Sequence, residues 1–513
     1  MNDQSKLARW FWRLFRWGLI TIALLVALLA ALIIEENWRG KRDCAAYQGA
    51  AAARGEPLDW SFLVPASVPD DQNFLKAPIF AGLTNLVWNA TLQDWQLNST
   101  NGVDLLAMSA CRNDGSSPSG DAASWQRAGL TRLEIWQRYY RQDVTNRSHE
   151  FPLSPQPQSP ADDVLLALSK YDPVIEGLRL ASRRPYSRLG KYGSNGLEDA
   201  LRTTLLARFK SWARVIQLRA IAELALGQNV RAFEEVQLLL RLDDLLRQEP
   251  LLFDHLVSQA ITAISLQPIY EGLAQNSWSD AQLAELEQAL AAKDALADFQ
   301  LAMRGERAFA IATLENQRIT GKDEQMSIEN GKPSTITFNL WWTPGAVFYR
   351  NELACARLNE ELLSPLVDRT NRVVSPAALR RASDALNEQL SQSSPYDAIA
   401  LMSLPVISRH VVGFAYAQTE VDLARVACAL QRYHLAHGEY PPALDDLGTQ
   451  FISPLPHDVI NGQPLRYRRT ADGKFALYSV GWNETDDGGI LAFTKNGALD
   501  HEHGDWVWQY PAK

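Results

Sequence analysis

The sequence predicts a mainly α-helical protein with a C-terminal α+β domain. We expect an N-terminal transmembrane helix, then an irregular array of α-helical hairpins, then one helix followed by a small antiparallel sheet. A charge-free apolar run lies near the N-terminus, apolar residues recur every three or four positions through the middle, and strand-like segments separated by turn residues fill the end. The chain has 513 residues, which is too many for one ordinary core.

The transmembrane helix is predicted from residues 18–34, which read GLITIALLVALLAALII and contain no charge. A helix rises about 1.5 Å per residue, so this run approaches a hydrocarbon thickness of about 30 Å. No small-x-small cleavage site follows, which favours an uncleaved signal anchor over a cleaved signal peptide. Cations and aromatic residues precede the run: Lys6, Arg9, Trp10, Trp12, Arg13, Arg16 and Trp17. They indicate a cytoplasmic N-terminus and an extracytoplasmic C-terminal bulk.

Changes in composition divide the rest of the chain. A proline-rich run, FPLSPQPQSP, is expected to be a linker between a mixed region and a long helical array. In the array, residues 197–227 and 230–246 are adjacent amphipathic segments separated by a glycine stop at Gly227, so we expect an antiparallel helical hairpin. Ser279 is expected to cap another helix. The predicted regions are a cytoplasmic segment 1–17, the anchor 18–34, a membrane-proximal mixed and helical region 35–150, the linker 151–160, the helical array 161–410 and an α+β domain 411–513.

The last region begins with a helix expected from about 411 to 437, which Gly438 stops. Two strand-like segments, LRYRR and KFALYSV, flank a TADG turn and predict a hairpin. Two more, ILAF and DWVWQY, are also strand candidates.

Three consecutive stretches of this region carry a family resemblance: TEVDLARVACALQRYHLAHGEYP, ALDDLGTQFISPLPHDVINGQPLRYRR and FALYSVGWNETDDGG. They resemble the globular domain of the major pseudopilin of type II secretion systems. The whole chain also resembles large membrane-anchored bacterial proteins of unassigned function with this ending. The resemblance implies a pseudopilin-like domain in a single-pass protein of the bacterial inner membrane. A prepilin peptidase site is missing, since Leu19 follows Gly18 and Ala23 takes the place of the expected Glu. Assembly into a pseudopilus is therefore not expected.

Major pseudopilins bind calcium in the loop that follows the Tyr-Ser strand. The resemblance implies a Ca²⁺ site formed by Asn483, Asp486, Asp487 and Asp505, whose oxygen atoms suit this cation. The alternative is an ordinary acidic loop, because Asp-Gly and Gly-Gly are typical of turns.

Other clusters have a structural and a functional interpretation. Two interpretations apply to the tryptophans, a sugar platform or packing in the core: Trp88, Trp95, Trp125 and Trp136. The run His501-Glu502-His503 suits a metal or a surface turn. An arginine- and tyrosine-rich loop suits an anion or is simply solvated; its cations are Arg183, Arg184, Arg188 and Lys191.

The composition also bears on function. The net charge of −9 gives no general basic face, so no nucleic-acid partner is expected. Four cysteines form no CxxC pair, and the sequence leaves open whether they are buried thiols or form a disulfide: Cys44, Cys111, Cys355 and Cys428. No GxSxG, Walker A, HExxH or GxGxxG motif is present, and no catalytic residue is nominated.

Together these observations predict a non-catalytic, membrane-anchored extracytoplasmic protein that binds or scaffolds a protein partner in the cell envelope. The pseudopilin resemblance suggests association with a type II secretion-like system. The alternative is an envelope hydrolase or a carbohydrate-binding protein.

Overall fold

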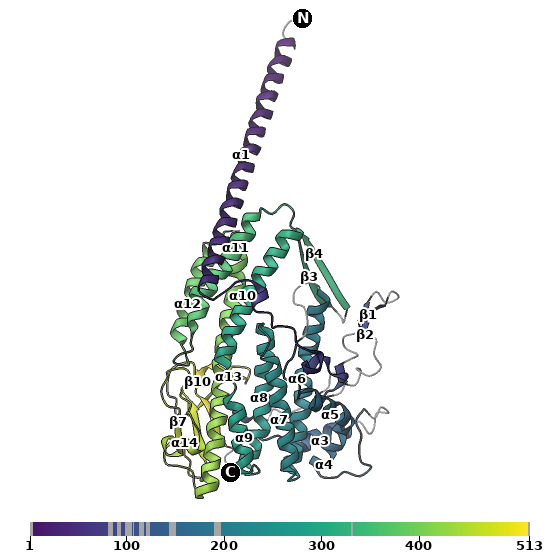
Figure 1. Cartoon of the computed structure of the whole chain (residues 1–513), viewed down its shortest axis with the longest axis vertical. Coiled ribbons are helices and arrows are strands. Elements are labelled where there is room, and N and C mark those ends of the chain that lie inside the picture. The colour runs from purple at the N-terminus through teal and green to yellow at the C-terminus, as the bar shows by residue number, and fades with distance from the viewer. Residues whose placement is uncertain are drawn as a thin grey trace. The chain divides into compact units, whose positions relative to one another are not determined.

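The structure is a computed structural model, and it is mainly helical with small antiparallel sheets near the C-terminus (Figure 1). It describes residues 4–80, 86–89, 94–97, 105, 107–111, 117–118, 124–142, 150–188, 196–329, 332–394 and 396–510. The chain forms two compact units, each assembled from separate segments. The first comprises Met1–Phe62, Arg307–Glu361 and Asp384–Pro405, and the second comprises Leu63–Glu306, Leu362–Ser383 and Val406–Lys513.

The first unit contains the predicted apolar helix. Helix α1 (Gln4–Ala53) is continuous, and its portion Trp10–Ala53 is long and apolar enough to cross a membrane. The apolar window is not buried anywhere in the described structure. The expectation of one long apolar N-terminal helix is therefore confirmed.

The C-terminal part of α1 packs against helix α11 (Gly345–Leu358). Glu36 pairs with Arg350 at 2.7 Å, and the thiol of Cys44 donates to Glu352 at 3.4 Å. The contacts occur in the same order along both helices, so α1 and α11 run parallel. The other elements of this unit are the end of α10 (Ala295–Thr320), the antiparallel hairpin β3 (Lys322–Glu329) and β4 (Lys332–Asn339), the end of α12 (Pro376–Ser391) and the start of α13 (Ala398–His437).

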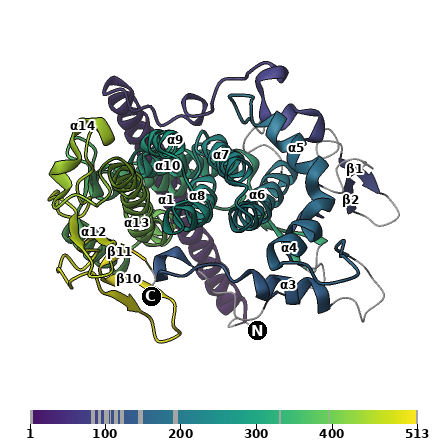
Figure 2. The same ribbon diagram turned by 90° about the horizontal axis from the view of Figure 1, so that it is seen from below.

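The second unit is built around three neighbouring helices, α6 (Gly196–Ala225), α7 (Asn229–Leu246) and α8 (Leu252–Ala274), which Figure 2 shows end on. The predicted hairpin of α6 and α7 is confirmed, and Gly227 joins them with a φ of +69°. Ser279 forms a capping box with Gln282 at the start of α9, as its position predicts. Further elements are β1 (Leu86–Asn89), β2 (Asp94–Leu97), α3 (Leu133–Arg141), α4 (Pro160–Leu168), α5 (Asp172–Ala181), α9 (Asp280–Ala291), β5 (Val367–Asp368) and β6 (Val373–Val374).

The proline-rich run between 151 and 160 is packed at both of its ends. Phe151 is buried, with its ring centroid 4.7 Å from that of Tyr140. Pro160 occupies the first turn of α4, and Ser159 caps that helix. The run therefore holds α4 against the core and is not the free linker that its proline content predicts.

The C-terminal part has the predicted order of helix and then sheet. Helix α13 ends at His437, and Gly438 follows with a φ of +81°. Strand β8 (Phe475–Ser479) lies between β7 (Arg466–Arg469) and β11 (Trp506–Gln509), antiparallel to both. Strands β9 (Leu491–Phe493) and β10 (Leu499–Gly504) form a second pair, and the short helix α14 covers Gly448–Phe451.

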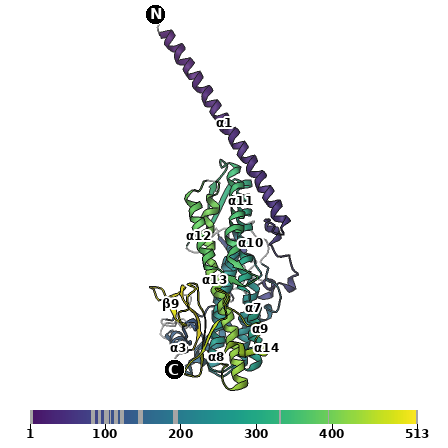
Figure 3. The ribbon, with the colours of Figure 1, turned by 90° about the vertical axis from the view of Figure 1, so that its left-hand side faces the viewer.

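Strands β8 and β11 share one hydrophobic core with the helices. Residues 421–430 of α13 are buried on all sides, and the same cluster contains Leu477 and Trp508 from the sheet and Ile269 from α8. Figure 3 shows the C-terminal strands next to the later part of α13. The boundary expected between residues 410 and 411 lies inside α13, which is continuous there.

Candidate binding pocket and the acidic loop

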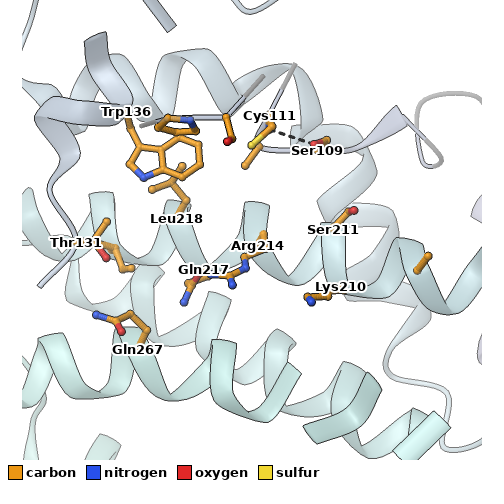
Figure 4. A pocket seen from close by; sticks show the side chains of 15 residues that line it. Ser109, Cys111, Thr131, Trp136, Lys210, Ser211, Arg214, Gln217, Leu218 and Gln267 are labelled. Atoms are coloured by element: carbon orange, nitrogen blue, oxygen red, sulfur yellow. Dashed lines mark hydrogen bonds between the residues drawn. The ribbon is translucent and has the colours of Figure 1, made fainter. Parts of the chain in front are cut away.

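The second unit contains a pocket of about 430 Å³ (Figure 4). Its walls come from α6, from α3, from residues 109–111 and 117–118 and from α8. The lining residues are Ser109, Ala110, Cys111, Ser117, Pro118, Thr131, Trp136, Ala207, Lys210, Ser211, Arg214, Gln217, Leu218, Ile221 and Gln267.

Helix α6 supplies the polar wall because its sequence places Lys210, Arg214 and Gln217 at i, i+4 and i+7, on one helical face. Most side chains on the other faces of the described part of α6 are apolar and buried. Trp212, for example, is fully buried and donates its indole N–H to the carbonyl of Leu105 at 2.8 Å. Burial of those faces fixes how the polar face is turned.

The floor of the pocket is held by amide side chains. Gln217 donates to the carbonyl of Ile264 on α8 at 2.9 Å, and its own oxygen accepts from Arg214 Nη1 at 3.3 Å. This chain of bonds orients the Arg214 guanidinium along α6.

Gln267 is fixed on the α8 side. Its oxygen accepts from the backbone N–H of Trp125 at 2.6 Å, and its nitrogen donates to Gly129 at 3.0 Å and to buried Glu271 at 2.8 Å. Glu271 also accepts from the hydroxyl of Thr131 at 2.7 Å. The wall is therefore formed before any ligand arrives.

An aromatic wall lies across from the α6 face. Trp136 is partly buried, with its ring centroid 5.9 Å from that of Tyr140 behind it. Ser109 accepts a hydrogen bond from the backbone N–H of Cys111 at 3.1 Å, which folds this segment over the pocket. Trp136 can thus offer an apolar ring surface to a ligand.

The lining is cationic. Lys210 and Arg214 are its two charged residues, and the described lining contains no Asp, Glu or His. Three hydroxyls, from Ser109, Ser117 and Ser211, add donors. Ammonium and guanidinium groups with hydroxyl donors suit carboxylate or phosphate oxygens. The lining can therefore hold an anionic group by charge-assisted hydrogen bonds.

Sequence reasoning missed this pocket. The signal in the sequence was the i, i+4, i+7 spacing of Lys210, Arg214 and Gln217 within an apolar-rich helical segment. The contributions from residues 109–118 and from Gln267 carry no recognisable motif.

Hydrogen bonds in the acidic loop connect Asn483, Asp487 and Asp505, whereas Asp486 has other partners. The Asn483 amide donates to Asp487 at 2.9 Å, and buried Asp505 accepts from the N–H groups of Asp487 at 3.3 Å and Gly489 at 2.6 Å. Asp486 accepts from the hydroxyl of Tyr478 at 3.2 Å and pairs with Arg466 at 3.3 Å.

The carboxylates in this loop are thus directed at N–H and O–H donors. Burial raises the pKa of Asp505, although three backbone N–H groups oppose the shift. Across the described residues, no group of three or more His, Cys, Asp or Glu is arranged to hold a metal ion. Calcium binding by Asn483, Asp486, Asp487 and Asp505 stays a prediction.

The other candidate clusters have separate partners. His501 lies under Tyr416, with ring centroids 4.0 Å apart, whereas His503 bonds Asp500 at 3.0 Å. Arg184 donates to the carbonyl of Asn73 at 3.0 Å, and Arg188 donates to Gln248 at 2.9 Å. These arginines fasten neighbouring segments. Lys191 lies outside the described residues.

Of the four tryptophans, the two with described side chains, Trp125 and Trp136, lie in different surroundings. Trp125 is buried against Trp508, at 4.9 Å between centroids, while Trp136 lines the pocket. Trp88 and Trp95 face each other in the register of β1 and β2, and their side chains lie outside the described part of the chain.

All four cysteines are free thiols in the structure. Cys44, Cys355 and Cys428 are buried, and burial raises the pKa of both Cys44 and Cys355 to about 12. A thiol with so high a pKa is almost entirely protonated at neutral pH and is a poor nucleophile.

A second pocket, of about 290 Å³, lies between α7 and α9 and has two carboxylates in its lining, Asp244 and Glu285. Both are held by neighbours. Asp244 pairs with Lys293 at 2.7 Å, and Glu285 accepts from Gln237 at 2.9 Å.

No protein family, curated protein or solved structure matches the chain.

Proposed function

We propose that the chain is a single-pass, membrane-anchored extracytoplasmic binding protein whose pocket takes a small anionic ligand. The observation that carries the ligand class is the lining, which combines Lys210, Arg214 and three serine hydroxyls with no acidic residue among its described members. Trp136 adds a ring surface, so the favoured ligand joins a carboxylate or phosphate to an apolar or cyclic body.

The anchor is supported by α1. Its large apolar side chains between residues 19 and 34 are mostly half or more exposed, and a stripe of this size in water would be costly. The cations before it and the positive-inside rule support a cytoplasmic N-terminus. The bacterial inner membrane is inferred from the pseudopilin resemblance of residues 411–513.

The same resemblance supports a scaffold role beside a type II secretion-like system. Affinity capture of the full chain from solubilised membranes tests that role. Enrichment of secretion-system subunits supports it, whereas a lone monomer without an enriched partner contradicts it.

A carbohydrate ligand is the second candidate, favoured by Trp136 in a lining that also offers serine hydroxyls and the Gln217 amide. An acidic sugar satisfies both interpretations. Neutral sugars would use the ring and the hydroxyls but leave the two cations without a counterpart.

Binding of defined anions to the full chain in lipid nanodiscs tests the ligand class. The probes are inorganic phosphate, a hexose phosphate, a hexuronic acid and the parent neutral hexose, measured by calorimetry. We expect the charged sugars to bind more tightly than the neutral one. The double variant K210E/R214E should weaken their binding by roughly 10- to 100-fold, because a hydrogen bond to a charged group contributes about 1.5–3 kcal/mol.

The matched control is R381E/K495E, which changes the net charge equally at two exposed residues outside the pocket. The control should bind like the parent chain. Equal loss in both double variants, or no binding of any probe, contradicts the proposal.

A further inference from the structure

The first unit exposes two adjacent tryptophans in the turn between β4 and α11. Trp341 is 69% exposed and Trp342 is 96% exposed, the largest exposure among the large apolar side chains described. Figure 1 shows this turn at the end of the unit from which α1 projects. A tryptophan so placed has no core function, and its exposure in water is unfavourable.

We propose that the Trp341–Trp342 turn inserts into the headgroup layer of the outer leaflet, beside the point where α1 leaves the hydrocarbon. The inference rests on the proposed anchor. It adds a second membrane contact to the protein, made by a turn more than 300 residues away in sequence from the span.

The level of the turn relative to the span is fixed by contacts between α1 and α11. The side-chain oxygen of Asn37 accepts from the backbone N–H of Ala346 at 2.6 Å. It thereby satisfies one of the free N–H groups at the start of α11, for which Pro344 supplies no side-chain cap. Asn37 lies three residues beyond Ile34, or about 4.5 Å along the helix.

Two further contacts fix the position of α11 along α1. Arg350 pairs with Glu36 at 2.7 Å, one turn further along α11. Gly40 lets the helices approach closely, since a Cβ atom there would lie 3.2 Å from the Cβ of Tyr349. The start of α11 is thus held within one helical turn of the end of the apolar run.

Contacts with Gly321, the residue that follows α10, hold the turn in place. Gly321 follows α10 with a φ of +65°, and a Cβ atom there would lie 2.8 Å from the ring of Trp341. The N–H of Leu340 donates to the carbonyl of Gly321 at 2.7 Å, and the N–H of Thr343 donates to Leu340 at 2.9 Å. Trp341 packs over the glycine, which leaves Trp342 directed outward.

The chemistry of the surrounding surface fits lipid headgroups. Tryptophan is enriched at this depth because its ring is apolar and its N–H is polar. Trp38 on α1 is also exposed, and the Arg42 guanidinium lies 5.0 Å from its ring centroid. Lys41 is exposed beside them. Cations at this level suit lipid phosphates. A protein partner at the turn is the competing outcome of the test.

Depth-resolved fluorescence quenching on the full chain in nanodiscs tests the inference. A fluorophore is attached to T343C, next to the intact tryptophans, in a chain that also carries C111S, because Cys111 is partly exposed. Lipids carry a nitroxide either at the headgroup or deep in the acyl chain. Two reference chains carry the fluorophore at L24C, in the span, and at F62C, an exposed site of the same unit.

Position 62 is a suitable aqueous reference. The neighbouring Trp60 packs on Phe309, with ring centroids 5.9 Å apart. Phe309 lies eleven residues before Thr320 on α10, which is roughly 16 Å from the end of α10 that braces the turn.

We expect the label at 343 to be quenched severalfold more by headgroup nitroxide than the label at 62, and the label at 24 to be quenched by the deep nitroxide. W341S/W342S should remove most of the quenching at 343 and leave quenching at 24 unchanged. If 24 is quenched and 343 behaves like 62, the inference fails and the anchor stands; a protein partner would then explain the exposed turn. If 24 is not quenched, both fail.

Discussion

At the scale of single residues, the second unit is held partly by charges that have no access to water. Asp243 on α7 and Lys293 are both buried, with Nζ and Oδ2 2.5 Å apart. Ser258 and Thr262 also donate to this carboxylate. Burial alone would raise the pKa of Asp243, but the charges of Lys293 and Arg247 outweigh it and lower the pKa.

Replacing Lys293 with Met should therefore be strongly destabilising, because it leaves Asp243 buried without its closest cation. We expect a loss of about 3–5 kcal/mol in the free energy of unfolding. The partly exposed pair Arg372–Asp294, at 3.1 Å, supplies the control, and R372Q should cost no more than about 1 kcal/mol. Denaturant unfolding measures both variants. Similar losses would contradict the account of the buried pair.

At the scale of elements, close helix approaches depend on particular glycines. A Cβ atom on Gly305 of α10 would lie 1.7 Å from the carbonyl oxygen of Pro250, so the backbone there admits no side chain. Gly413 of α13 is different, since its nearest atom would be the side-chain oxygen of Gln259 at 3.5 Å, an ordinary contact.

This difference predicts opposite results for the same substitution. G305A should lower the melting temperature of the full chain by several degrees, because α10 must move away from Pro250. G413A should leave the melting temperature unchanged or raise it, since Ala is favoured over Gly inside a helix by about 0.5–1 kcal/mol. Differential scanning calorimetry of the two variants decides, and a stable G305A variant would show that α10 does not approach Pro250 so closely.

Some features of the elements can be predicted from the sequence, and others cannot. Gly227, Ser279 and Gly438 predict helix ends because stop and cap chemistry is local, and the structure confirms all three. The approach of Gly305 to Pro250 is not predictable, since it depends on the fold. The sequence predicts only part of the pocket. The shared helical face of Lys210 and Arg214 follows from their spacing, whereas the opposite wall comes from α3, α8 and residues near 110.

At the scale of the whole molecule, buried carboxyls give the second unit a characteristic pH dependence. Burial raises the pKa of Glu223, Asp298 and Glu420 to about 7 and that of Glu249 to about 8. The folded protein therefore keeps protons that the unfolded chain has released. Their stabilisation is fully present below about pH 4, the usual range of these groups, and is lost as the pH rises through the folded pKa values.

We therefore expect the melting temperature to fall between pH 6.5 and 8, with a loss of a few kcal/mol, at about 1.4 kcal/mol per pH unit for each carboxyl still protonated. E249Q should make the decline smaller, because Glu249 has the highest of these pKa values. E234Q, at an exposed residue of α7, is the control and should keep the parent slope. A melting temperature that rises over this interval would contradict the assignment.

The separation of the chain into units is also a property of the whole molecule. Each unit gathers segments from distant parts of the sequence, and α13 contributes to both. Composition alone predicts contiguous regions, since it records local changes and not which helices share a core. The apolar helix α1 is predictable from composition, because the charge-free run of residues 18–34 indicates it without reference to any tertiary contact.

The central claim is that α1 crosses the membrane once and leaves the body on the extracytoplasmic side. Protease accessibility of the full chain, expressed in bacterial cells, tests it most directly. We predict that the chain resists alkaline carbonate extraction, that protease digests the body in spheroplasts, and that inverted inner-membrane vesicles protect it. Release by carbonate, or protection in spheroplasts with digestion in inverted vesicles, would contradict the claim.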